Sequence, residues 1–130
     1  MVQPLISLLI VFSSIGFIRG WPYIPDKTYV QIHNVIPGAN LTAHCRSKED
    51  DLGVHVLPPL DQYEFQFKPS FFGATLFYCL FSWPEESHHF DIYDEKRDYY
   101  MCSHCTWWIK TSGPCSGSNQ DKCTPYHWKS

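Results

Sequence analysis

Six cysteines are the strongest constraint on what this chain can fold into, because they stand in a chain of only 130 residues. In a short secreted protein, such a composition predicts an oxidised framework that supports a modest hydrophobic core. We expect three disulfides and no free thiol. The sequence alone does not choose among the possible pairings. The residues concerned are Cys45, Cys79, Cys102, Cys105, Cys115 and Cys123.

The first 20 residues indicate secretion. Residues 5–18 form an uncharged apolar run that is short for a bilayer crossing, and Arg19 follows it. We therefore predict a signal peptide over residues 1–20, cleaved near Gly16 or Gly20, with a short signal anchor as the alternative. Residues 21–130 would then be a single extracellular domain. We expect no membrane insertion after cleavage, because no later segment approaches spanning length.

The charge balance argues against partners that carry many negative charges. Without Arg19, nine Lys and Arg stand against thirteen Asp and Glu, a net charge of −4. Proteins that bind nucleic acids or anionic membranes usually present a basic face. We therefore expect no nucleic-acid partner.

Alternation of apolar and polar residues predicts short strands throughout the mature chain. We expect Val54 and Val56 to face inward, and we expect the strand at 75–83, apolar on both faces, to be central and covered on both sides or nearly so. No helical periodicity persists over three turns. Seven to eight strands separated by turn signals predict an all-β fold, a small antiparallel β-sandwich stapled by disulfides. The expected strands are 28–35, 40–46, 53–57, 62–68, 75–83, 88–93 and 105–110.

A charged loop after Cys45 is the candidate recognition site. Exposed charges contribute about 0–1 kcal/mol each to folding, whereas charges at an interface steer association. We therefore predict that the loop contacts a receptor and that Leu52 anchors it, with a plain polar hairpin as the alternative. If the loop is only structural, the contact surface should lie at 82–87 or 94–98. The charged residues are Lys48, Glu49, Asp50 and Asp51.

Asn40 begins an Asn-Leu-Thr sequon with no proline in the middle. The sequon follows a Pro-Gly turn in a chain that we predict to be secreted. We therefore predict N-glycosylation at Asn40.

Four patterns could carry chemistry, and none is specific. Cys102 and Cys105 have redox CxxC spacing, but a strand follows where a redox site needs a helix N-terminus. A zinc site formed by Cys102, Cys105, Cys115 and Cys123 would lack a second close pair. His89 shares a strand face with Asp91, but no nucleophile accompanies them, and adjacent His88 must point the other way. The acids at 49–51 lack the spacing of a calcium loop. We assign no catalytic residue, cofactor or metal.

Several motifs in order carry a resemblance to a known family. The segment His44-Cys45-Arg46-Ser47-Lys48-Glu49-Asp50-Asp51-Leu52-Gly53 resembles the signature of the plant self-incompatibility S1 family, also called S-protein homologues. The later motifs follow in family order and spacing, and Cys45, Cys79, Cys105 and Cys115 have the clearest counterparts. These motifs are Phe71-Phe72-Gly73-Ala74-Thr75-Leu76-Phe77-Tyr78-Cys79, Phe90-Asp91-Ile92-Tyr93, Arg97-Asp98, Cys105-Thr106-Trp107-Trp108-Ile109 and Gly113-Pro114-Cys115.

The resemblance implies a function by binding. It points to a secreted, monomeric, non-enzymatic signalling ligand for a plasma-membrane receptor on pollen or another cell, as in self-incompatibility. The alternatives are a secreted defence or toxin-like protein, or a secreted enzyme of unknown type.

Overall fold

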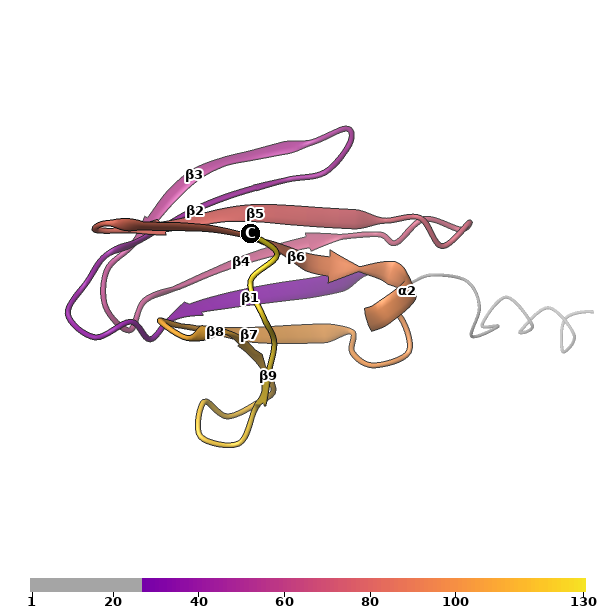
Figure 1. The fold of residues 1–130 in the computed structure, drawn as a ribbon. Helices are drawn as coiled ribbons and strands as arrows, with labels where there is room; N and C mark the ends of the chain where they lie inside the picture. Colours follow the sequence, from indigo (N-terminus) through magenta and orange to yellow (C-terminus); the bar gives the residue numbers. More distant parts are fainter. Residues whose placement is uncertain (1–26) are drawn as a thin grey trace, which may run out of the picture.

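The protein is a sandwich of two β-sheets in a computed structural model that describes residues 27–130 (Figure 1). The predicted signal peptide lies outside the described residues. One sheet has the strand order β4-β1-β7-β8-β9 and the other the order β3-β2-β5-β6. The strands are β1 (Thr28–Asn34), β2 (Leu41–Arg46), β3 (Asp51–Leu57), β4 (Gln62–Phe67), β5 (Leu76–Trp83), β6 (Glu86–Asp94), β7 (His104–Lys110), β8 (Gly113–Ser116) and β9 (Thr124–Pro125).

The all-β sandwich is confirmed, with two differences in detail. The described chain has nine strands, because residues 113–116, which lie outside the expected strands, pair with β7, and β9 pairs with β8. Most neighbours are antiparallel, but β1 and β7 are parallel. This pairing places β1 beside a strand that begins more than 70 residues later. It joins the pair β4-β1 to the strands β7-β8-β9 in one five-stranded sheet.

The core lies between the two sheets and is built from alternating residues, as the period-2 pattern predicts. On β1, Val30 and Ile32 are fully buried, and on β7, Trp107 and Ile109 are buried. From the other sheet, Phe81 of β5 and neighbouring apolar residues of β2 and β6 complete the layer. Large rings fill much of the space, which suits a small core because each ring buries a large area.

The orientation predicted for strand β3 is wrong. Val54 and Val56 are 61% and 57% exposed, whereas His55 faces inward. The register sets Ala43 opposite His55, and residues directly opposite on two strands share a face. The His55 ring stacks on Tyr63 at 3.8 Å, and its Nε2 lies 2.8 Å from the carbonyl oxygen of Leu52. These contacts make an inward histidine acceptable at a sheet edge.

Strand β5 is central, as predicted, because it pairs with β2 on one side and β6 on the other. It is fully covered on one face only. Phe77, Cys79 and Phe81 are buried, whereas Tyr78 and Leu80 on the other face are half-buried. Among residues 27–130, no further sheet covers that outer face, where Tyr78 and Leu80 keep part of their surface exposed.

Asn34 is a fully buried polar residue that organises one end of the sandwich. Its Nδ2 donates to the carbonyl oxygens of Ala39 and Leu57 at 2.8 and 2.9 Å, and its Oδ1 accepts from the backbone N–H of Ile36 at 2.9 Å. A buried amide is tolerated when its hydrogen bonds are made. This side chain therefore fixes the turn that leads to Asn40.

A candidate recognition surface at one end of the sandwich

Three loops gather at the end of the sandwich where β1 and β7 begin. The register shows this directly, since Thr28 lies opposite Phe67, Tyr29 opposite His104, and Leu76 opposite Asp94. The charged loop belongs to the same end, because Arg46 lies opposite Tyr78. Figure 1 shows the three loops at the end that carries the short helix α2 (Glu95–Asp98). They are the segments 47–50, 68–75 and 95–103.

The charged loop, expected over residues 47–52, is shorter in the structure. It spans residues 47–50 and is closed by two hydrogen bonds: Ser47 N–H donates to the Asp50 carbonyl at 2.8 Å, and Asp50 N–H donates to Ser47 Oγ at 3.1 Å. Lys48, Glu49 and Asp50 have exposed side chains. A loop that is closed by its own backbone holds these charges in a defined arrangement.

Asp51 has a structural role that distinguishes it from the three charges before it. It lies in β3 and pairs with Arg46. Its Oδ1 accepts from the Gly53 N–H at 2.9 Å and lies 2.7 Å from His44 Nε2. Gly53 has a φ of 82°, as expected for a glycine beside a tight loop.

These partners change the titration of Asp51. The hydrogen bond from the Gly53 backbone, followed by that to His44, lowers the pKa of Asp51 below its ordinary value. A lowered pKa in the folded state means that the ionised form stabilises the fold. The contribution is complete above the ordinary pKa and is lost as the pH falls through the lowered value.

Leu52, the residue expected to anchor the loop, is half-buried and packs against the core. The charged loop therefore rests on an apolar contact at its base. Cys45, just before the loop, is buried and is bonded to Cys79 on the neighbouring strand.

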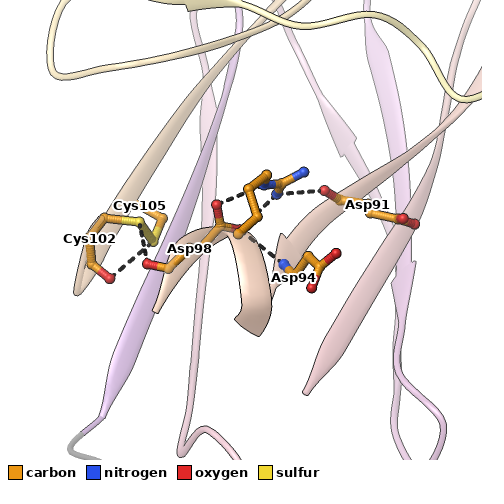
Figure 2. The surroundings of a disulfide bond; sticks show 6 residues. Asp91, Asp94, Asp98, Cys102 and Cys105 are labelled. Atoms are coloured by element: carbon orange, nitrogen blue, oxygen red, sulfur yellow. Dashed lines mark hydrogen bonds and ion pairs between the residues drawn. A yellow bond between two sulfur atoms is a disulfide. The ribbon is translucent and has the colours of Figure 1, made fainter. Parts of the chain in front are cut away.

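The segment 94–98 is not the exposed charged connection that the sequence suggests. Asp98 is buried, and its carboxylate accepts from Arg97 Nε and Nη2, both at 2.7 Å, and from the Asp94 N–H at 2.9 Å (Figure 2). Arg97 also donates to the Asp91 carbonyl oxygen at 2.8 Å. This segment is therefore a satisfied ion-pair network that holds the 95–103 loop, and it offers no free charges of Arg97 or Asp98 to a partner.

Aromatic rings complete the environment of Arg97. Its guanidinium carbon lies 5.3 Å from the Phe90 ring centroid, 5.2 Å from that of Trp107 and 5.5 Å from that of Tyr126. Burial lowers the pKa of Arg97, but the hydrogen bonds to Asp98 outweigh it, so the pKa is raised. The adjacent Arg97-Asp98 pair was the only sequence signal for this site.

The six cysteines form three disulfides. The pairs are Cys45–Cys79, Cys102–Cys105 and Cys115–Cys123, and no described cysteine is free. The four cysteines considered as zinc ligands are thus engaged in disulfides. In the described part of the chain no group of three or more His, Cys, Asp or Glu side chains could hold a metal ion.

The histidines considered for acid–base chemistry contact the end of the chain. His88 stacks on Trp128 with ring centroids 4.9 Å apart, and its Nε2 lies 3.2 Å from Glu86. His89 Nδ1 lies 2.9 Å from Ser130 Oγ, and Asp91 forms an ion pair with Lys129 at 3.0 Å. These residues therefore fasten the C-terminal segment to β6 and do not converge on one point.

An exposed aromatic group, which the sequence analysis missed, stands on the other two loops of this end. Phe71 and Phe72, expected to lead into a strand, lie in a turn before β5, and both are exposed. Tyr100 and Met101 follow α2 and are exposed as well. Asn40 is also exposed but lies at the opposite end, before β2. The hairpin 82–87 is at that opposite end too, because it joins the far ends of β5 and β6.

Comparison with known proteins agrees with this architecture. The profile of the family described as plant self-incompatibility protein S1 matches residues 29–128. S-protein homolog 5 of Arabidopsis thaliana is 42% identical over 127 residues, which cover 95% of this chain and 98% of that protein. S-protein homolog 2 of the same plant is 43% identical over 113 residues, which cover 78% and 70%.

A solved structure has the same fold. It is described as that of SPH (Self-Incompatibility Protein Homologue) proteins, "a widespread family of small, highly stable, secreted proteins from plants". It aligns with a TM-score of 0.61 at 18% identity and covers 82% of this chain and 97% of that one. No helix among residues 27–130 is long and apolar enough to cross a bilayer. The chain therefore belongs to the plant self-incompatibility protein S1 family, the S-protein homologues, which are small secreted plant proteins.

Proposed function

We propose that this protein is a monomeric, non-enzymatic extracellular ligand that contacts a plasma-membrane receptor through the charged loop 47–50. The observation that carries the proposal is the loop itself: three consecutive exposed charges on a turn closed by its own hydrogen bonds. Charges in a defined arrangement can penalise wrong partners and accelerate correct encounters. Their value to folding is small, because exposed charges contribute about 0–1 kcal/mol even when paired.

A rigid base supports this role. The loop joins β2 to β3, and β2 is joined to the core strand β5 by the disulfide between Cys45 and Cys79. Binding loops on rigid scaffolds lose less conformational freedom when they bind. Family membership supports the same proposal, because S-protein homologues are a family not known as enzymes.

Substituting the loop charges should weaken binding without unfolding the protein. We expect Glu49→Ala with Asp50→Ala to keep the melting temperature within about 4 °C of wild type, since less than about 1 kcal/mol is at stake. Association of the labelled protein with intact plant protoplasts should become slower and less sensitive to salt. Asp51 is left unchanged because it holds His44 and Gly53.

The matched control is Asp121→Ala with Lys122→Ala, two exposed charged residues in the loop before β9. This control should bind like wild type. The proposal fails if the loop variant associates with protoplasts as fast as the control does.

We also propose that Asn40 carries an N-linked glycan. Its side chain is exposed in the loop before β2, at the opposite end from the charged loop, so a glycan there would leave the proposed contact surface open. Peptide N-glycosidase treatment of the secreted protein should reduce its mass, and Asn40→Gln should abolish that change. An unchanged mass after treatment would show that the sequon is unused.

A further inference from the structure

The two loops beside the charged loop enclose a cleft of about 350 Å³. One wall is a pair of rings, Phe71 and Phe72, in edge-to-face contact with centroids 5.6 Å apart. The other wall is a second such pair, Tyr99 and Tyr100, with centroids 4.8 Å apart. Two aromatic pairs from loops more than 20 residues apart in sequence thus line one space.

A buried carboxylate lies in the same cleft. Glu95, also a lining residue, is only 6% exposed. Its Oε1 accepts a hydrogen bond from the Thr75 N–H at 3.0 Å, and its own N–H donates to the Thr75 carbonyl at 3.0 Å. Its other oxygen, Oε2, accepts no hydrogen bond from residues 28–130. That oxygen lies beside Gly73: a Cβ added to this glycine would lie 3.8 Å from Oε2.

Because Glu95 Oε2 is not enclosed by the protein, a hydrogen-bond donor that enters the cleft can reach it. The negative charge of Glu95 also affects Tyr93: burial, and then the charge of Glu95, raise the pKa of Tyr93 to about 12. Aromatic faces carry negative potential and attract organic cations. Aromatic walls and a carboxylate therefore select the same ligand class and disfavour anions.

We propose that this cleft binds an organic cation: the guanidinium or ammonium group of an Arg or Lys side chain on a partner protein. The rim favours a protein as its source. Phe72 and Tyr100 are 89% and 94% exposed, and Met101 next to them is also exposed, so apolar surface extends beyond what a small free cation would cover. An interface with an aromatic centre and an anchoring Arg is a common arrangement at binding hot spots.

Lys96 also lines the cleft and is exposed. Its ammonium group would compete with an incoming cation. Removing the Lys96 ammonium group should therefore tighten binding of a cation, whereas removing the carboxylate or a ring of the same cleft should weaken it.

The test uses probes and needs no receptor, so its outcome is independent of the proposed role of the charged loop. N-acetyl-arginine amide and N-acetyl-lysine amide are titrated into the ¹⁵N-labelled protein, and the amide resonances of Gly73 and Tyr100 are followed by NMR. We expect both probes to shift these resonances. N-acetyl-citrulline amide, the uncharged analogue of the arginine probe, should not shift them.

Two variants test the two halves of the site. Glu95→Gln keeps an oxygen for the Thr75 N–H and should weaken binding about tenfold, as expected for loss of a charged hydrogen-bond acceptor. Phe72→Ala removes an exposed ring and should weaken binding about two- to fivefold, the change that matches one cation–π contact. Lys96→Ala should tighten binding, and Val54→Ala, at an exposed site on β3, should leave it unchanged.

Three results would overturn the inference. The citrulline probe could shift the resonances as strongly as the arginine probe, which would show that the cleft does not distinguish a charged ligand from an uncharged one. Glu95→Gln and Phe72→Ala could both bind the probes like wild type. Choline chloride, added as a third cation, could bind where neither amino-acid probe does, which would exclude a protein side chain as the occupant.

Discussion

Asp98→Ala is expected to lower the free energy of unfolding by about 3–5 kcal/mol, the usual cost of removing one partner from a buried ion pair. Asp98 is buried and holds three donors: Arg97 Nε, Arg97 Nη2 and the Asp94 N–H. Without the carboxylate, the partners that the described residues leave to the Arg97 guanidinium are the Asp91 carbonyl oxygen and the surrounding rings. Unfolding in guanidinium chloride, followed by tryptophan fluorescence, would measure the loss of stability.

Two further variants separate this ion pair from simple loss of packing. Arg97→Met with Asp98→Ala removes both charges and should recover part of the stability, because no unpaired charge is left in the core. Asp121→Ala removes an exposed carboxylate and should change the unfolding free energy by less than about 0.5 kcal/mol. If Asp98→Ala costs no more than Asp121→Ala, the network does not hold the 95–103 loop.

Removing the disulfide between Cys45 and Cys79 should be the most damaging of the three cysteine deletions. These cysteines are 34 residues apart in sequence, whereas the other pairs are separated by 8 and by 3. A cross-link that closes a longer loop restricts the unfolded chain more. Chain-entropy estimates are about 4 kcal/mol for the Cys45 pair, about 2.5 for the Cys115 pair and about 1.5 for the Cys102 pair.

The comparison is made with three double alanine variants, each of which removes one complete pair and leaves no free thiol. Thermal unfolding should rank their melting temperatures in the order of those costs. Alanine also removes sulfur atoms from the core at Cys45 and Cys79, both of which are buried, so packing loss adds to the entropy term there. Equal melting temperatures for the three variants would contradict the ranking.

The fold class followed from local pattern. Alternation of apolar and polar residues predicted the strands, because side chains on a strand point to opposite faces in turn. On β1, for example, Val30 and Ile32 alternate with polar residues, and both are fully buried. The three disulfides were expected from the number of cysteines and the secreted character of the chain. Both inferences depend on neighbouring residues or on composition, and neither requires a distant partner.

Local sequence patterns are misleading where a distant partner decides the outcome. Val54 and Val56 suit a buried position better than His55 does, but the register with β2 turned them outward. A one-residue change of register reverses every side chain of a strand, and a single strand carries no information about its register. Asp98 resembles a surface charge because only the folded chain brings Phe90, Trp107 and Tyr126 around its partner Arg97.

The candidate surfaces show the same division. The sequence by itself determined that charged residues follow Cys45 and that rings stand at 71–72 and 99–100. Only the tertiary structure decided that both groups lie at one end of the sandwich and that Glu95 lines the same cleft as the rings. The reason is topological: the two ring-bearing segments flank β5 and β6, and the antiparallel pairing of these strands sets Leu76 opposite Asp94, which brings residues 71–72 and 99–100 to the same end.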